Sequence, residues 1–194
     1  MNHLVIFMHS STDSFNGAIL DNYVAALKKN GDHVYVRNLA EQLFYPLLTK
    51  KEYEQSLNSD YARDVKEEQT YIAKADVITF IFPMWWGGFP AIGKGYIDRV
   101  FSYGFAYRLK NESPIPLLNG KKGRIIFTSG TPEKEMHETG LYDHFVDGVN
   151  QSIFTFCGVE LEGVLHFGNI IETSPSSRKK MLEKVSEFAN MPNK

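Results

Sequence analysis

Short apolar runs alternate with amphipathic stretches along this chain of 194 residues. The apolar runs predict buried strands at residues 4–8, 34–36, 77–82, 124–127 and 160–167. Apolar residues at helical spacing predict helices at about 15–30, 62–74 and 141–157, and others that begin at Pro90 and near Ser174. This alternation is typical of a doubly wound α/β fold, in which helices cover both faces of a parallel sheet. No repeat or linker divides the chain, so we expect residues 1–194 to form one domain.

Strands linked by helices in this way fit the sheet order 2-1-3-4-5, in which a ligand binds beyond the carboxyl ends of the strands. In that order the loops after the first, third and fourth strands converge near the switch point between strands one and three. We therefore expect residues 9–16, 83–88 and 128–132 to form a shared site. The connection at residues 39–59 is long and polar, which predicts an excursion over the surface.

Charge and composition narrow the classes of partner. A net charge of −2 and a pI near 6.3 give no electrostatic reason to expect nucleic acid or an anionic membrane as partner. No apolar run is long enough to span a membrane and no signal segment precedes the first strand, so we expect a cytoplasmic protein without membrane insertion. The single cysteine, Cys157, lies in an apolar segment and predicts a buried structural thiol in a reducing compartment. The histidines lack metal-ligand spacing, and we expect no metal.

The loop after the third strand carries the most unusual residues of the chain. The apolar run leads into Pro83 and Met84, and then into the tryptophan pair Trp85 and Trp86 before Gly87. Large flat side chains beside glycines that admit a ligand to the backbone suit a planar aromatic cofactor. A tryptophan pair that plugs the end of a core is the alternative.

The loops after the first and fourth strands are rich in hydroxyl groups. The first leads into a predicted helix, and hydroxyls and free N–H groups at a helix N-terminus bind phosphate. The alternative is an N-cap formed by Asp13 or Ser14. Neither a G-x-G-x-x-G fingerprint nor a Walker A lysine motif occurs, which disfavours a Rossmann dinucleotide site and a P-loop. Residues 128–132 end the fourth strand with groups that suit a ligand edge, or else form a plain turn.

Residues 82–107 resemble the flavin-binding loop and following helix of the NAD(P)H:quinone oxidoreductases. This flavodoxin-like family includes DT-diaphorase and the bacterial drug-modulator and potassium-efflux ancillary reductases. The family pattern is matched at Phe82, Pro83, Trp86, Pro90, Ala91, Lys94, Gly95, Tyr96, Ile97, Asp98, Arg99, Val100, Phe101, Phe105, Ala106 and Tyr107. The resemblance implies a flavodoxin-like fold with a five-stranded parallel sheet of order 2-1-3-4-5 and helices on both faces. For Asp98 and Arg99 we expect a structural ion pair or a subunit contact.

The resemblance also assigns the flavin to the three loops. The implied cofactor-binding residues are His9, Ser14, Phe15 and Asn16 at the phosphate, Pro83, Met84, Trp85, Trp86 and Gly87 around the ring, and Thr128, Ser129, Gly130 and Thr131 at its pyrimidine edge. Asp13 departs from the family pattern and is left out, because a carboxylate repels a phosphate. Ser129 and Thr131 stand as substitutions in the family's T-T-G-G turn.

Further residues are implied in catalysis. Tyr107 matches a tyrosine that lines the substrate side of the flavin, often from the neighbouring subunit. His137 and Tyr142 lie in the region where relatives place a tyrosine and a histidine that assist proton delivery, with a different spacing.

The function implied by the resemblance is that of a two-electron flavin reductase. It would use NADPH or NADH, and pass hydride to a quinone or similar acceptor by a ping-pong mechanism. The compact chain favours FMN, with FAD as the alternative. A homodimer is implied, and the aromatic cluster of Tyr103, Phe105 and Tyr107 supports it. A flavodoxin-like electron carrier and a regulatory subunit of a potassium-efflux system are the alternative functions; the net charge of −2 argues against the carrier, since flavodoxins are strongly acidic.

Overall fold

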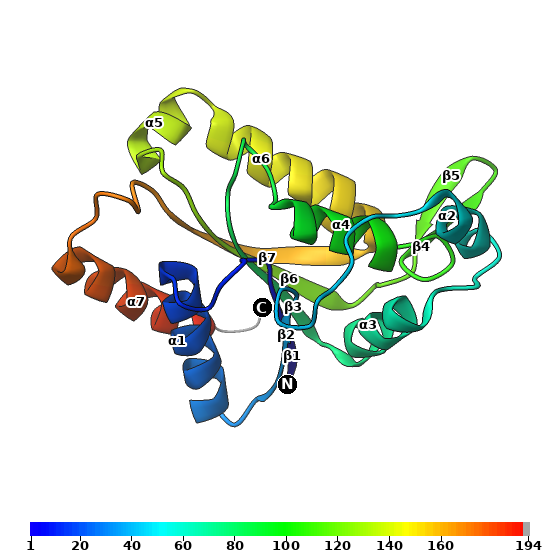
Figure 1. Cartoon of the computed structure of the whole chain (residues 1–194), viewed down its shortest axis with the longest axis horizontal. Helices are drawn as coiled ribbons and strands as arrows, with labels where there is room; N and C mark the ends of the chain where they lie inside the picture. The colour runs from blue at the N-terminus through cyan, green and yellow to red at the C-terminus, as the bar shows by residue number, and fades with distance from the viewer. Residues whose placement is uncertain (192–194) are drawn as a thin grey trace.

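Five parallel strands form the central sheet of the computed structural model, which describes residues 1–191 (Figure 1). Their bounds are β1 (Asn2–Phe7), β2 (His33–Asn38), β3 (Val77–Pro83), β6 (Lys121–Thr128) and β7 (Val159–Phe167). They lie in the order β2–β1–β3–β6–β7, so the predicted flavodoxin-like order 2-1-3-4-5 is confirmed. Every residue of β3 is buried, because this central strand has a neighbour on each side and helices on both faces.

Helices cover both faces of the sheet, as predicted (Figure 1). On one face lie α1 (Phe15–Lys29) and α7 (Pro175–Ala189), and on the other lie α3 (Arg63–Lys74), α4 (Ala91–Val100) and α6 (Leu141–Val149). Strand β1 shows how the side chains divide between the two cores. Leu4 and Ile6 join the core under α3, α4 and α6, whereas Val5 and Phe7 join the core under α1 and α7. The period of two in a strand therefore supplies both cores from a single apolar run.

The structure corrects several of the predicted connections. A short helix, α2 (Lys50–Ser56), lies inside the segment expected to be a polar excursion, and α5 (Glu133–Glu138) follows the loop after β6. Two strands outside the main sheet, β4 (Tyr107–Lys110) and β5 (Ser113–Pro116), pair in an antiparallel hairpin. The helix predicted at residues 141–157 is α6 followed by the π-helix η1 (Asn150–Thr155). These elements are too short for apolar periodicity to reveal them.

Arg99 of α4 is buried and forms structural ion pairs. Of the two roles predicted for this residue, an ion pair or a subunit contact, the structure has the first. Its guanidinium lies 2.7 Å from Asp64 of α3 and 2.8 Å from Glu52 of α2, and it donates to the Tyr45 carbonyl at 2.6 Å. These bonds hold α2, α3 and α4 together. Asp98 does not take part, because it forms its own surface ion pair with Lys94 one turn earlier.

Cys157 is buried, and burial raises the pKa of its thiol to about 12. The thiolate is therefore not formed near neutral pH, in agreement with the predicted structural role. Within residues 1–191, no helix is long and apolar enough to cross a membrane. In the same part of the chain, no cluster of His, Cys, Asp and Glu side chains is placed to hold a metal ion.

Candidate active site

The loops that follow β1, β3 and β6 meet at the carboxyl edge of the sheet. The Asn16 amide donates to the Thr128 hydroxyl at 2.8 Å, which joins the first loop to the third. The Met84 N–H donates to the Thr128 carbonyl at 2.7 Å, which joins the second to the third. The rings of His9 and Trp85 lie 6.0 Å apart, so the first and second loops are also neighbours. We call residues 9–16, 85–88 and 128–131 the loop edge.

The first loop wraps tightly over the start of α1. Ser14 is the N-cap, and its hydroxyl accepts from the Gly17 N–H at 3.1 Å and donates to the Ser11 carbonyl at 2.9 Å. A side chain at Gly17 would place its Cβ 1.8 Å from the Thr12 carbonyl oxygen, so only glycine lets the loop fold back this closely. Sequence reasoning missed Gly17, although its place just inside the helix after Phe-Asn was a visible signal.

Several groups of this loop remain available to a ligand. The N–H groups of Phe15 and Asn16, in the first turn of α1, donate to no residue that the structure describes. Together with the helix dipole, such groups attract an anion. The side chain of Asn16 is buried, and its amide oxygen has no hydrogen-bond partner in the described chain. Since a buried acceptor is rarely left unpaired, Asn16 is suited to receive a hydrogen bond from a bound molecule.

The second loop is a tight turn that holds both tryptophans outside the core. Trp85 and Gly88 exchange backbone hydrogen bonds of 3.1 and 3.0 Å. Trp86 and Gly87, the two residues that lie between this pair, have φ values of 53° and 72°, which are typical of a type I′ turn. Glycine takes this conformation freely, whereas a bulky side chain such as that of Trp86 is strained there.

The exposure of the tryptophans decides between the two predictions for this loop. Trp86 is 105% exposed and Trp85 is 46% exposed, so the alternative in which the pair plugs the end of a core is wrong. The turn directs these side chains outward instead. The N–H groups of Trp86 and Gly87 donate to no described residue, whereas that of Met84 is committed to the sheet. Strain stored in an exposed aromatic residue is typical of a functional position.

The third loop is held from within by hydroxyl bonds. The Ser129 hydroxyl donates to the Thr131 carbonyl at 2.8 Å and lies 2.8 Å from Nε2 of His166. Thr128 and Ser129 are buried, whereas Gly130 is exposed and Thr131 is half-buried. The N–H groups of Gly130 and Thr131 make no hydrogen bond within residues 1–191.

Two of the residues implied in catalysis lie side by side next to this loop. The rings of His137, in α5, and Tyr142, in α6, are 4.3 Å apart. Burial raises the pKa of the Tyr142 phenol, so this side chain keeps its proton near neutral pH. His166 of β7 lies behind them, with its ring 5.7 Å from that of Tyr142. Sequence reasoning missed His166 because it is embedded in an apolar strand.

Tyr107 lies apart from the other predicted residues. It contacts Tyr103 and Phe156, with ring centroids 5.9 and 4.8 Å away, at the far end of α4. A helix of ten residues is about 15 Å long, so α4 separates Tyr107 from the loop edge of its own chain. The structure thus joins His137 and Tyr142 to the loop edge and does not join Tyr107 to it.

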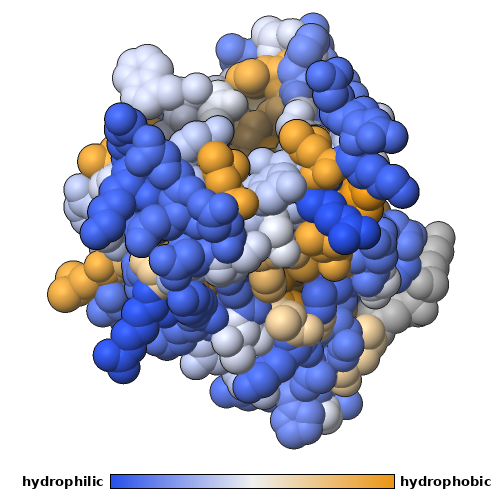
Figure 2. Space-filling model, turned by 90° about the vertical axis from the view of Figure 1, so that its right-hand side faces the viewer, coloured by the Kyte–Doolittle hydropathy of each residue, from blue (hydrophilic) through white to orange (hydrophobic). Residues whose placement is uncertain are grey.

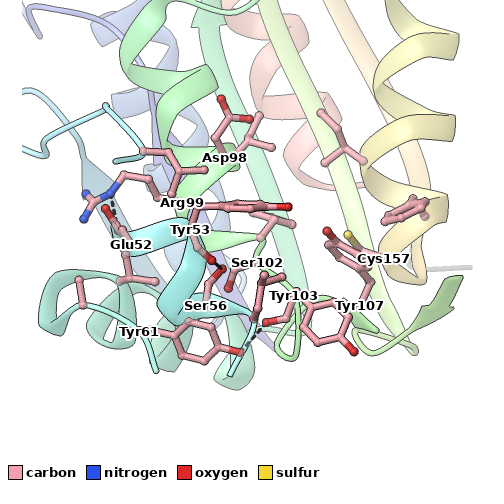
Figure 3. Close-up of a pocket in the computed structure, with 18 of the residues that line it drawn as sticks. Glu52, Tyr53, Ser56, Tyr61, Asp98, Arg99, Ser102, Tyr103, Tyr107 and Cys157 are labelled. Carbon is pink, nitrogen blue, oxygen red and sulfur yellow. Dashed lines mark hydrogen bonds and ion pairs between the residues drawn. The ribbon is translucent and has the colours of Figure 1, made fainter. Parts of the chain in front are cut away.

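Tyr107 lines a cavity of about 460 Å³ between α2, α4 and η1. Figure 3 shows Tyr53, Tyr103 and Tyr107 around this space, and Figure 2 shows hydrophobic residues gathered around a hollow on this side of the molecule. A second cavity, of about 500 Å³, runs along α4 and α6 and begins at Gly87. The two cavities share Ile97, Asp98, Ser152 and Ile153, so one groove leads from the loop edge to Tyr107.

The flavodoxin-like fold family model matches residues 1–189. The chain belongs to this family. A protein of Haemophilus influenzae named as an uncharacterized NAD(P)H oxidoreductase is 37% identical over 184 residues, which cover 94% of this chain and 91% of that one. The NAD(P)H dehydrogenase [quinone] 1 of Cavia porcellus is 30% identical over 200 residues, which cover 92% of this chain and 72% of that one.

A solved structure supports the same relationship. The NAD(P)H:quinone oxidoreductase from Methanothermobacter marburgensis superposes with a TM-score of 0.87 at 25% identity, over 97% of this chain and 95% of that one. These similarities confirm the resemblance to the NAD(P)H:quinone oxidoreductases that residues 82–107 indicated.

Proposed function

We propose that the protein is a flavin-dependent NAD(P)H:quinone oxidoreductase. The observation that carries this proposal is the set of unpaired backbone donors along the loop edge. The N–H groups of Phe15 and Asn16, of Trp86 and Gly87, and of Gly130 and Thr131 come from three loops, of which the first and the second are each hydrogen-bonded to the third. Fixed donors at one sheet edge suit a ligand that has both a phosphate and a flat polar ring. A flavin has both features, and the named relatives support it.

The residues present fit such a cofactor, with FMN as the form we propose. Phe15 and Asn16 would hold the phosphate at the N-terminus of α1, and the donors of the other two loops would hold polar atoms of the ring. A bound flavin supplies the hydride chemistry between NAD(P)H and the acceptor. The N–H groups of Gly130 and Thr131 favour negative charge that develops beside them.

Other residues act on the acceptor and on water. Trp85 and Trp86 exclude water from the face of the site that they border. Tyr142 keeps its proton beside the loop edge, with the ring of His137 next to it, and reduction of a quinone oxygen requires a proton from such a side chain. NAD(P)H and the acceptor would use the same space in turn, which gives ping-pong kinetics.

Purification tests the proposal directly. We expect a yellow protein with about one flavin per chain, which heat releases for chromatographic identification as FMN or FAD. Anaerobic NADH or NADPH should bleach the bound flavin, and a quinone should restore its colour. Steady-state rates measured at several quinone concentrations should give parallel double-reciprocal lines, as a ping-pong mechanism requires. A colourless protein that binds neither FMN nor FAD at micromolar concentration would contradict the proposal. A stable blue semiquinone would favour the electron-carrier alternative.

We also propose that the active form is a homodimer in the cytoplasm, a compartment that fits the single unpaired Cys157. The groove between the loop edge and Tyr107 is lined mainly by apolar groups, and the strained Trp86 at one end of it is fully exposed. Tyr103 and Tyr107 are only partly covered at the other end. A second copy related by a two-fold axis would cover both ends and bring its Tyr107 to this chain's loop edge.

Mixed dimers test this arrangement. Asn16→Ala damages the loop edge of its own chain, and Tyr107→Phe removes only a hydroxyl. If Tyr107 serves the partner's site, a dimer of one N16A chain and one Y107F chain contains one intact site and regains about half of the activity. If Tyr107 serves its own chain, the mixed dimer contains no intact site. If light scattering shows a monomer and that monomer is fully active, the shared site is refuted.

A further inference from the structure

His166 lies directly behind the loop after β6. It stands opposite Phe127 in the register of β6 and β7, and the two rings stack with centroids 4.3 Å apart and an angle of 16° between their planes. This stacking places Nε2 of the imidazole 2.8 Å from the Ser129 hydroxyl. The side chain therefore links the buried core to the third loop of the proposed flavin site.

The hydrogen inventory fixes the direction of this bond. The Ser129 hydroxyl has a single hydrogen. Its oxygen lies 2.8 Å from the Thr131 carbonyl oxygen, which can only accept a hydrogen bond. Ser129 therefore donates to Thr131 and accepts from His166. The imidazole must then carry its hydrogen on Nε2 and an unshared electron pair on Nδ1.

The surroundings of Nδ1 agree with this neutral form. The atom is buried and has no hydrogen-bond partner within residues 1–191. Burial, and to a smaller extent His137, lower the pKa of the imidazole to about 4. His166 is therefore a permanent neutral donor at neutral pH rather than a group that exchanges protons with the solvent.

The bond shapes the turn that follows. Two backbone hydrogen bonds hold Ser129 against β7 and the chain beyond it. The Ser129 N–H donates to the Phe167 carbonyl at 3.0 Å, and the Ser129 carbonyl accepts from the Ile170 N–H at 3.1 Å. Gly130 is exposed and lies between Ser129 and Thr131, whose carbonyl also accepts from the Asn169 N–H at 3.1 Å. The hydroxyl bridge from Ser129 to the Thr131 carbonyl closes the turn from inside, and His166 fixes the hydroxyl that makes it.

We propose that His166 is a positioning residue that acts through Ser129 to keep the N–H groups of Gly130 and Thr131 free for the bound cofactor. This inference rests on the proposed function and adds a residue to it. The competing role is packing alone, in which the imidazole matters only as a flat ring on Phe127.

Paired substitutions separate the two roles. His166→Gln keeps an N–H donor at about the reach of Nε2 and loses the ring, whereas His166→Phe keeps the ring and loses the donor. We expect H166F to weaken flavin affinity roughly tenfold, the effect of one lost hydrogen bond in a buried setting, and to lower the flavin midpoint potential. H166Q should stay within about threefold of the parent protein. The opposite ranking would overturn the proposal.

A second variant tests whether the effect passes through Ser129. Ser129→Ala removes the acceptor, and the double variant S129A/H166F should then bind flavin no more weakly than the weaker single variant. Additive losses would contradict the coupling. Thermal unfolding of each apoprotein separates loss of flavin affinity from loss of folding.

One measurement is independent of the flavin. In 15N NMR spectra of the apoprotein near neutral pH, we expect His166 to show a protonated Nε2 and an unprotonated Nδ1. The reverse tautomer, or a charged ring, would overturn the hydrogen-bond assignment. If the protein binds no flavin, the proposed function fails and the positioning role with it, while the tautomer still decides the arrangement of Ser129, Thr131 and His166.

Discussion

Two polar regions of the molecule, the ion cluster around Arg99 and the loop edge, differ in how their polar groups are paired. Arg99 directs its donors to Asp64, Glu52 and the Tyr45 carbonyl, all at 3.1 Å or less. At the loop edge, by contrast, donors from three loops and the amide oxygen of Asn16 have no partner in the described chain. Exposed donors bind water or a ligand, whereas a buried acceptor such as the Asn16 amide oxygen is rarely left without a partner. In the function that we propose, the first region therefore serves stability and the second serves binding.

The largest expected effect is on folding and comes from the paired region. Arg99→Met removes a buried guanidinium and its bonds to Glu52, Asp64 and the Tyr45 carbonyl, whereas the side chain of Asp64 is 49% exposed and stays solvated. We expect the free energy of unfolding to fall by about 3 kcal/mol from the lost charge-assisted hydrogen bonds, with flavin affinity of the folded fraction unchanged. Chemical denaturation and flavin titration of the same variant provide both values.

Lys66→Met is the matched control for Arg99. Lys66 forms an exposed pair with Asp60 at 3.4 Å, and such pairs contribute about 0–1 kcal/mol. If the two variants were equally stable, the buried cluster would not have the structural role assigned to it here.

The next effect is on binding and comes from the loop edge. Trp86→Ala removes an exposed side chain and keeps the Cβ at positive φ, so we expect the free energy of unfolding to stay constant. Flavin binding should weaken by about 2–4 kcal/mol if the indole covers the cofactor, and quinone turnover should fall. Flavin dissociation and thermal unfolding measured on one variant test both statements.

Leu43 is the matched control for Trp86, because it is also exposed, at 87%, and also has a positive φ, of 52°. It lies outside the loop edge, so Leu43→Ala should leave flavin affinity unchanged. Equal losses in the two variants would remove Trp86 from the proposed site.

Much of this arrangement is predictable from the sequence, for identifiable reasons. The strands and main helices follow from apolar runs such as residues 77–82, a strand buried on both faces in which Thr79 is the one polar residue. The convergence of the loops follows from the sheet order, because the order places the ends of β1, β3 and β6 together. The residues in the pattern from Phe82 to Tyr107 indicated the family.

Other features depend on contacts between distant residues, and the sequence does not reveal them. The role of Gly17 depends on the Thr12 carbonyl folding back over α1, and that of His166 on its place opposite Phe127. The outward direction of Trp86 depends on a turn that places a tryptophan at positive φ, against its usual preference. Such positions depart from local rules, which is where functional constraints are expected.

The pH dependence of stability provides a smaller test, at His166 on the core side of the loop edge. The pKa of His166 is lowered to about 4, whereas an unfolded histidine titrates near 6.5. Between these values the unfolded chain binds a proton that the folded chain does not, so stability is complete above pH 6.5 and falls as the pH falls toward 4. We expect this group to account for a loss of about 1–2 kcal/mol between pH 7 and pH 5. Denaturation of the parent protein and of H166Q at both values tests this, since the variant should lose less; identical losses would contradict it.

The smallest expected effect compares two similar buried hydrogen bonds, one in each kind of region. The Tyr23 hydroxyl lies 3.1 Å from the Thr79 hydroxyl inside the core, and the Asn16 amide lies 2.8 Å from the Thr128 hydroxyl at the loop edge. Asn16→Ala removes one such bond and should lower the free energy of unfolding by about 1 kcal/mol. Tyr23→Phe also removes the bond that the Tyr23 hydroxyl accepts from the Arg124 guanidinium at 3.3 Å, so it should lower the free energy of unfolding by about 1–2 kcal/mol. Only Asn16→Ala should weaken flavin binding, because only Asn16 has an amide oxygen without a partner in the described chain. Denaturation and flavin titration of both variants decide the comparison. If Y23F lost as much flavin affinity as N16A, binding would depend on core stability in general. It would then not depend on the unpaired groups of the loop edge.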